Sequence, residues 1–169
     1  MEMIKQRKEK LGRNNADMSR LKLIILIVAC LMLSVSFLGC GEKITVKLEL
    51  KANREGDGLV ISGTTTNLPN GTLLAYEIRK DYGDELMPAE PYFVDGTVTV
   101  ENGRYEKRIT GVPSGKISVW VAFQTILGTD VGQPQGVLEK FGKMGEKLTG
   151  ENVIESGNIK RVEKEVFVE

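Results

Sequence analysis

The stretch Ile117-Ser-Val-Trp-Val-Ala-Phe-Gln124 is the most apolar of the expected β-strands and decides the fold class. Its large apolar side chains recur at every second position, on the face formed by Ile117, Val119, Val121 and Phe123. A period of two residues is that of a strand with one face in a core. We therefore expect this face to fill a sandwich core and Trp120 to lie on the opposite face, with Ser118 and Ala122.

Six further segments have the alternation or the β-branched composition of strands: residues 44–51, 59–66, 73–80, 96–100, 104–110 and 160–168. Residues 53–58 are expected to form a turn. Residues 67–72 are expected to form a tight connection in which Asn70 and Gly71 supply positive φ angles. About seven strands with turns at short intervals predict an all-β fold, a single antiparallel sandwich.

The run Glu101-Asn-Gly103 is the strongest short-range hairpin signal in the chain. It predicts that residues 96–100 pair with residues 104–110. In the second of these strands, the alternation that buries Tyr105 and Ile109 would turn Lys107 inward. We therefore expect this strand to be an edge strand or to carry a bulge.

One helical segment is expected before the last strand, because four apolar residues fall at intervals of four, three and four: Val137, Phe141, Met144 and Leu148. Pro134 suits its beginning and Gly150 its end. Gly142 and Gly145 each cost about 1 kcal/mol relative to alanine in a helix. A short or irregular helix is therefore expected.

The N-terminal part has the organisation of a signal peptide. Residues 23–38 form an apolar core of 16 residues, short for a membrane-spanning helix, which needs about 20. Residues 1–39 carry seven basic and three acidic side chains, a bias typical of the cytoplasmic side. Translation could begin at Met1 or at Met18, which opens a compact leader with two positive charges. The alternative is an uncleaved anchor helix in which Cys30 and Cys40 are ordinary apolar residues.

The end of the apolar core, Phe37-Leu-Gly-Cys40, resembles the lipobox of bacterial lipoproteins. The resemblance implies cleavage after Gly39 and a diacylglyceryl group on the sulfur of Cys40. The family favours Leu three places before the cysteine, where this chain has Phe37. Ile27-Val-Ala-Cys30 also fits the pattern, but it would leave a short core and an apolar tail on the mature protein. The implied organisation is a signal peptide at residues 1–39, a lipidated tether at 40–43 and a β-sandwich at 44–169.

A second resemblance concerns the run Thr66-Asn-Leu-Pro-Asn-Gly-Thr72, which follows a strand that contains glycine. It is similar to a turn in small β-sandwich domains of bacterial lipoproteins that have no assigned activity. The resemblance covers residues 59–123. It implies an immunoglobulin-like or transthyretin-like sandwich and brings no activity, ligand or cofactor with it.

Composition excludes several classes of function. The chain has no histidine, and therefore no Ser-His-Asp triad, Cys-His pair or histidine-ligated zinc. With 16 of the 23 basic and 20 of the 23 acidic residues, residues 40–169 carry a charge of −4, which argues against nucleic acid as a partner. Residues 136–144 approach the phosphate-binding loop pattern, but the glycine spacing is wrong and Met144 replaces the hydroxyl residue, so no nucleotide is expected.

Two groups of residues are candidates for ligand or partner contact. An exposed Trp120 could stack on a sugar or anchor a partner; alternatively, the apolar stripe of the helical segment folds back and covers it, which we favour. Asp81, Asp84 and Glu85, near Glu90 and Asp95, could collect calcium, but their spacing is not that of an EF-hand. A solvated loop explains them better, so no metal and no cofactor are expected.

We thus expect a lipid-anchored protein on the extracytoplasmic face of a bacterial membrane, without catalytic activity. Our first interpretation of its function is a binding or structural module of the cell envelope. The second is an inhibitor or accessory subunit that docks on another protein through residues 67–72 or 81–91. A hydrolase working through paired carboxylates is the weakest, because no acidic residue lies in an apolar context that would raise its pKa.

Overall fold

The computed structural model describes residues 42–128 and 131–169. Glu42–Glu169 is one compact unit. The expected signal peptide, with its expected cleavage after Gly39 and lipidation of Cys40, lies outside the described residues. In the described part of the chain, none of the helices has the length and apolar character needed to cross a membrane.

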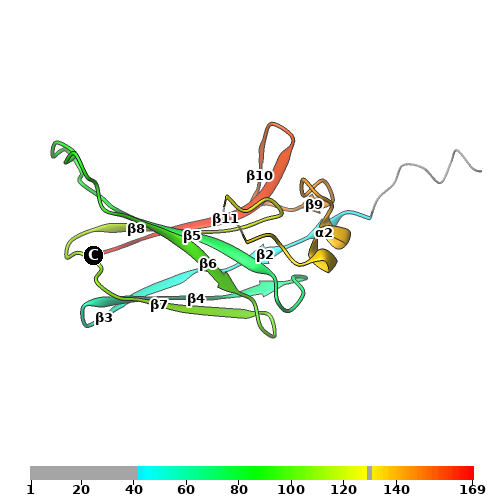
Figure 1. Cartoon of the computed structure of the whole chain (residues 1–169), viewed down its shortest axis with the longest axis horizontal. Helices are drawn as coiled ribbons and strands as arrows, with labels where there is room; N and C mark the ends of the chain where they lie inside the picture. Colours follow the sequence, from blue (N-terminus) through cyan, green and yellow to red (C-terminus); the bar gives the residue numbers. More distant parts are fainter. Residues whose placement is uncertain (1–41, 129–130) are drawn as a thin grey trace, which may run out of the picture. The chain divides into compact units, whose positions relative to one another are not determined.

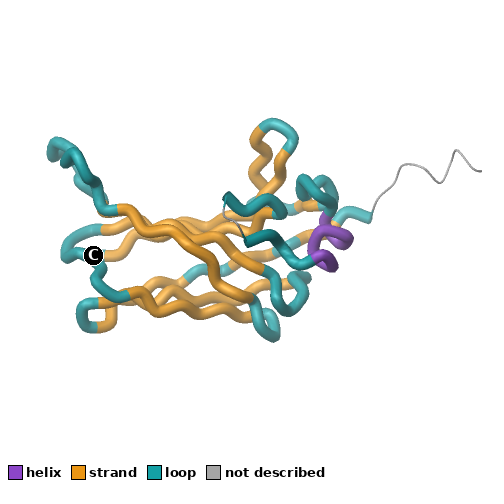
Figure 2. The backbone as a smooth tube through the Cα atoms, viewed as in Figure 1, coloured by secondary structure: helices purple, strands orange, loops and turns teal. Residues whose placement is uncertain are grey.

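The fold is all-β, as the sequence predicts, with two antiparallel layers (Figures 1 and 2). The larger sheet has the strand order β10-β11-β8-β5-β6. Its strands are β5 (Leu73–Lys80), β6 (Phe93–Thr99), β8 (Ile117–Gln124), β10 (Val153–Ser156) and β11 (Ile159–Val168). All neighbouring strands in it are antiparallel.

The smaller sheet is built around β4 (Gly58–Thr66). Its other strands are β2 (Lys47–Leu48) and β3 (Lys51–Glu55), which pair with one side of β4, and β7 (Arg104–Ile109), which pairs with the other. A separate parallel pair joins β1 (Ile44–Thr45) to β9 (Leu148–Thr149). The single strand expected at residues 44–51 is thus divided into short pieces, and the expected turn at 53–58 is narrower because β3 continues to Glu55.

The core lies between the two sheets, as predicted. Ile117, Val119, Val121 and Phe123 of β8 are all fully buried. From the smaller sheet, Leu59 and Ile61 are also fully buried. Because all the core side chains belong to residues 46–162, the β-domain contains its own hydrophobic core.

The hairpin predicted at Glu101-Asn-Gly103 is only partly correct. The turn forms, with positive φ at Asn102 (51°) and Gly103 (71°) and two backbone hydrogen bonds between Glu101 and Arg104. The flanking strands, however, belong to different sheets: β6 pairs with β5, and β7 pairs with β4. The turn therefore connects the two layers at their edge. β7 is an edge strand, as expected, and Lys107 is exposed there.

The expected helical segment is shorter than its apolar stripe. Helix α2 (Gln135–Phe141) follows Pro134, and the next residue, Gly142, has a φ of 86°. Val137 and Phe141 are buried by the helix, and Phe141 packs edge-on against Phe123 with the ring centroids 4.9 Å apart. Leu148 is buried from β9 instead. The helix therefore closes one end of the core (Figure 2).

Two turns differ from the sequence prediction. In the connection from β4 to β5, Asn67 (66°) and Gly71 (82°) have positive φ, and Asn70 does not. The hairpin of β10 and β11, which turns at Gly157 with a φ of 60°, was not predicted. Its β10 half has four residues, of which three are exposed, and so it lacks the alternation by which strands are recognised.

Candidate functional site

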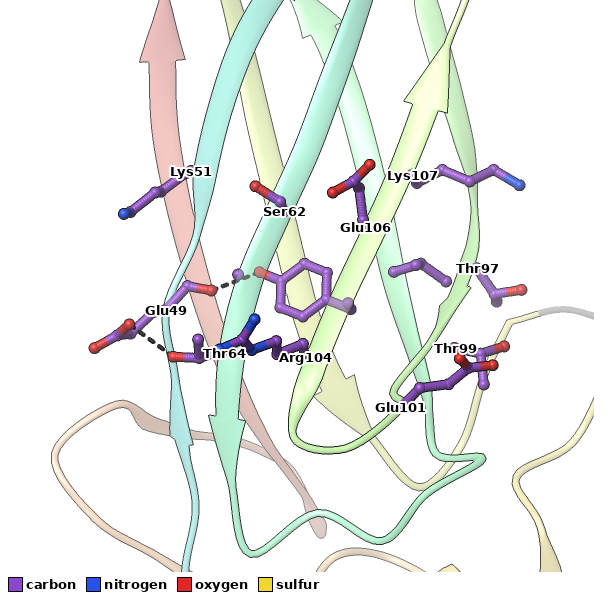
Figure 3. Close-up of a pocket in the computed structure, with 13 residues that line it drawn as sticks. Glu49, Lys51, Ser62, Thr64, Thr97, Thr99, Glu101, Arg104, Glu106 and Lys107 are labelled. Carbon is purple, nitrogen blue, oxygen red and sulfur yellow. Dashed lines mark hydrogen bonds between the residues drawn. The ribbon is translucent and has the colours of Figure 1, made fainter.

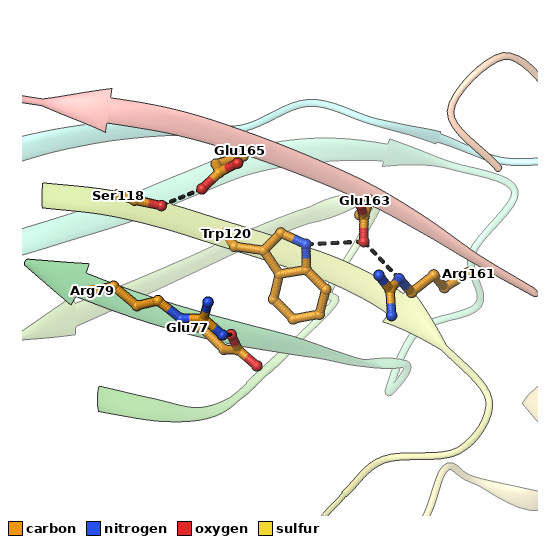
Figure 4. Close-up of polar contacts among 7 residues, drawn as sticks. All are labelled: Glu77, Arg79, Ser118, Trp120, Arg161, Glu163 and Glu165. Carbon is orange, nitrogen blue, oxygen red and sulfur yellow. Dashed lines mark hydrogen bonds and ion pairs between the residues drawn. The ribbon is translucent and has the colours of Figure 1, made fainter. Parts of the chain in front are cut away.

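The outer face of the larger sheet, centred on Trp120, is the candidate site (Figure 4). Trp120 lies in the central strand β8, directly opposite Glu77 of β5 and Glu165 of β11. Asp95 of β6 lies opposite Glu77 in the same row. The ring is half-buried, and carboxylates flank it on both sides along the row.

One edge of the indole ring is held in place by a polar contact. The indole N–H donates to Oε2 of Glu163 at 3.0 Å, and Nε of Arg161 donates to the same oxygen at 2.6 Å. The guanidinium carbon of Arg161 lies 5.7 Å from the Trp120 ring centroid, within cation–π range. Since Glu163 satisfies the N–H, the free surface of Trp120 is its aromatic face.

Other polar side chains around Trp120 are paired with each other. Ser118 hydrogen-bonds to Glu165, and Arg79 forms an ion pair with Glu77 at 2.5 Å. Figure 4 shows Ser118 on the same strand as Trp120 and the other three side chains on the two neighbouring strands. The face therefore offers an aromatic surface among fixed hydrogen-bond donors and acceptors. This combination orients polar ligands.

Two hollows adjoin Trp120. One, of about 300 Å³, is lined by Glu77, Arg79, Ser118, Trp120, Arg161 and Glu165. The other, of about 120 Å³, extends toward β6 and includes Asp95, Gly96 and Leu127. On the inner face of the sheet, Gly96 leaves space for Tyr76, whose hydroxyl oxygen would lie 2.6 Å from a Cβ at this position. A ligand lying across the sheet would contact Trp120 from both hollows.

The expectation that the helical segment covers Trp120 is wrong. The buried residues of α2 pack against Phe123, on the inner face of the sheet, and Trp120 points to the outer face. The physical reason is the length of α2. Its seven residues supply two buried side chains, Val137 and Phe141, and both are used in closing the end of the core.

Two more aromatic residues lie on the same face, and the sequence analysis missed them. Phe93 and Phe167 are 48% and 60% exposed, and both belong to the row next to that of Trp120, through pairing with Arg79 and Ser118. Arg79 lies over the Phe93 ring at 5.4 Å and Lys116 over the Phe167 ring at 4.8 Å. The alternation along β11 could have identified Phe167, because it places this residue on the other face of the sheet from Val166 and Val168.

The structure does not bring the acidic residues of the 81–91 loop together. Asp81 forms an ion pair with Lys116 at 2.7 Å and accepts the Gly83 N–H at 2.9 Å. These contacts hold the pKa of the Asp81 carboxyl below its usual value. Asp84 and Glu85 are exposed. Within residues 42–128 and 131–169, no three acidic or cysteine side chains are grouped as metal ligands would be.

A larger hollow, of about 700 Å³, follows the edge at β7 (Figure 3). Its one ring, Tyr105, is 3% exposed, because it lies over Gly63 and donates its hydroxyl to the Glu49 carbonyl at 2.6 Å. Burial, followed by the Glu49 charge, raises the pKa of Tyr105. A ring in this position cannot stack on a ligand. Apart from Gly63 and Val98, the remaining lining is polar, with contacts such as the hydrogen bond from the Thr64 hydroxyl to the Glu49 carboxylate at 2.7 Å.

No family model matches the chain, and no curated protein does.

Proposed function

We propose that the protein is a bacterial envelope lipoprotein without catalytic activity, whose β-domain binds a polar polymer of the cell wall through the Trp120 face. The observation that carries the proposal is the position of Trp120. It lies half-buried in the central strand of the larger sheet, on the outer face, with its N–H satisfied by Glu163 and its ring among paired charges. An apolar ring framed by polar groups suits a ligand with an apolar face and many hydroxyls, such as a glycan.

The proposed anchor is a lipid on Cys40, supported by the basic leader, the short apolar core and the small residue Gly39 before the cysteine. The first strand begins at Ile44. Three residues, 41–43, then separate Cys40 from the β-domain, and they span at most about 10 Å when fully extended. The domain would thus be held at the extracytoplasmic face of the membrane, beneath the cell wall.

The pKa shifts of two carboxyl groups argue against a general-acid role for those two residues. In the described part of the chain, the carboxyl groups of Asp81 and Glu146 have pKa values below the usual range, because both accept hydrogen bonds. A general acid for glycoside hydrolysis needs a raised pKa. Neither residue has the environment of such an acid.

The proposal is tested by retention on insoluble peptidoglycan. The full chain, extracted from membranes in detergent, is sedimented with purified cell-wall sacculi, and the bound fraction is compared with that of Trp120→Ala. We expect Trp120→Ala to lose most of the retention, because stacking is lost while the paired charges remain. Leu86→Ala, at an exposed site on the 81–91 loop, is the matched control and should be retained like the wild type. Equal retention of the wild type and Trp120→Ala contradicts the proposal.

A second candidate, an inhibitor or accessory subunit, is favoured by one observation. The 81–91 loop projects beyond the end of the sandwich opposite α2 (Figure 1), and its Leu86 and Met87 are 97% and 69% exposed. Exposed apolar side chains on a projecting loop suit insertion into a partner's groove. For this candidate, Leu86→Ala would abolish partner capture and Trp120→Ala would not.

A further inference from the structure

The end of the β-domain where its first strand begins has three lysines around one hollow: Lys43, Lys140 and Lys147. The hollow has a volume of about 580 Å³, and its other lining residues are Glu42, Ile44, Thr45 and Asn67. We propose that this lysine hollow docks on the anionic phosphate headgroups of the membrane and so fixes the orientation of the domain. The inference rests on the proposed anchoring through Cys40.

The lysine amines are held by neutral groups. Lys43 donates to the Glu146 carbonyl at 3.2 Å, Lys140 to the Asn67 carbonyl at 2.7 Å and Lys147 to the Glu139 carbonyl at 3.0 Å. Across residues 42–128 and 131–169, none of the three amines is in an ion pair. Their positive charges are therefore positioned by backbone carbonyls and not by ion pairs with described carboxylates.

Two lysines elsewhere in the domain are in ion pairs instead. Lys116 is paired with Asp81 at 2.7 Å and Lys160 with Glu155 at 3.2 Å. At the lysine hollow the single carboxylate of the lining is that of Glu42. The Glu146 carboxylate accepts the Met144 N–H at 2.8 Å, and its backbone hydrogen bonds, followed by the nearby Lys147 charge, lower its pKa. Positive charge is thus concentrated at this end.

The positive charge of the lysine hollow contrasts with the net charge of −4 that residues 40–169 carry. An acidic domain near an anionic bilayer is repelled unless it presents a basic surface. The tether of about 10 Å is comparable to the Debye length of about 8 Å at physiological salt, so the lysines are held where the surface potential acts. The same orientation places the 81–91 loop, at the opposite end of the sandwich, away from the membrane (Figure 1).

The test uses the full chain in lipid nanodiscs, with the amine reactivity of each lysine read by mass spectrometry after brief acetylation. One set of discs contains phosphatidylglycerol and phosphatidylcholine, and the other contains phosphatidylcholine alone. We expect Lys43, Lys140 and Lys147 to react roughly fivefold more slowly in the anionic discs. High salt should remove the difference. Lys51, Lys107 and Lys164 are internal controls and should react equally in both.

A pair of variants separates docking from general charge effects. If the hollow docks on the membrane, the β1 and β9 amides should exchange more slowly in anionic discs than in neutral ones. Replacing Lys43, Lys140 and Lys147 with glutamine should abolish this difference. The matched variant, with Lys51, Lys107 and Lys164 replaced by glutamine, loses the same charge and should keep that slower exchange.

Equal reactivity of the three lysines in both discs overturns the proposal. It is also overturned if inorganic phosphate, at matched ionic strength, protects them equally in neutral discs, because the hollow would then be a site for a free anion. Failure of the anchor is read separately, from the intact mass of the same sample. Failure of the Trp120 face is read from retention on sacculi.

Discussion

The indole N–H of Trp120 donates to Oε2 of Glu163, which lies one strand away in the larger sheet, at 3.0 Å. Arg161 shares that oxygen at 2.6 Å. Glu163 thereby holds both the tryptophan ring and the arginine that lies beside it. The orientation of the proposed binding surface depends on this one carboxylate.

Glu163→Ala should therefore weaken retention on cell-wall sacculi while changing stability little. The pair of Glu163 and Arg161 is partly exposed, and exposed pairs contribute about 0–1 kcal/mol. Glu163→Gln keeps an acceptor for the indole N–H. A larger fraction of this variant than of Glu163→Ala should therefore be retained on sacculi. Retention is measured by sedimentation and stability by urea unfolding. Identical retention of the wild type and Glu163→Ala would show that the ring orientation is not used.

Trp120→Ala should cost little stability because the ring lies outside the core. Its cross-strand contacts with Glu77 and Glu165 are each worth about 0.2–1 kcal/mol. Phe123→Ala removes a fully buried ring and should cost about 3–5 kcal/mol. The free energies of unfolding in urea give the comparison. Equal losses for the two variants would mean that Trp120 is covered after all.

The sequence predicted the core more completely than the surface. Alternation along β8 identified the four residues that it buries on its inner face, because burial on one face imposes a period of two, but it did not predict that Ala122 is also buried. The sequence pattern could not predict whether the two strands that flank the Glu101–Arg104 turn pair with each other. The same two-residue turn can join strands within one sheet or strands of two different sheets. The Asn102-Gly103 dipeptide specifies the local φ angles, and the partners of β6 and β7 are set by long-range packing.

The candidate site was only partly predictable for a related reason. The alternation placed Trp120 on the outer face correctly, but its environment comes from three other strands that are distant in sequence. The apolar stripe of residues 137–148 suggested a cover. The chain leaves the helix after Phe141, and Leu148 joins a strand instead. Whether an amphipathic segment covers one face or closes an end depends on loop geometry, which the stripe does not encode.

Tyr105→Phe tests the contact between β7 and Glu49. Loss of the 2.6 Å hydrogen bond to the Glu49 carbonyl should cost about 1 kcal/mol at neutral pH. Because burial raises the pKa of Tyr105, folding favours the neutral phenol. Its contribution is therefore complete below the ordinary pKa of about 10 and is lost as the pH rises above it.

The measurement is the free energy of urea unfolding from neutral pH to about pH 11. The wild type should lose stability over the alkaline part of this range more steeply than Tyr105→Phe. Tyr76 and Tyr92 remain in the variant, and burial also raises their pKa values. The free energy of unfolding of Tyr105→Phe should therefore still fall at alkaline pH, but less steeply. Parallel curves for the two proteins would contradict the assignment to Tyr105.

Gly63→Ala tests the close approach of Tyr105 to β4. A Cβ at Gly63 would lie 1.9 Å from the Glu49 carbonyl oxygen and 2.6 Å from the Tyr105 hydroxyl oxygen. Such overpacking should cost about 1–3 kcal/mol or more. Gly136→Ala, within α2 and with open space around its Cβ, is the control and should gain about 0.5–1 kcal/mol. Thermal unfolding of both variants gives the answer, and a Gly63→Ala protein as stable as the wild type would rule out this packing.

The Trp120 face and the lysine hollow both depend on the β-domain being held outside the membrane by its N-terminus. The most direct test is the intact mass of the protein extracted from bacterial membranes. The account predicts a chain that begins at Cys40 and carries the added mass of a diacylglyceryl group, with or without a further acyl chain on its new amino terminus. A membrane-extracted chain that still contains residues 1–39, with no lipid mass on Cys40, would contradict it.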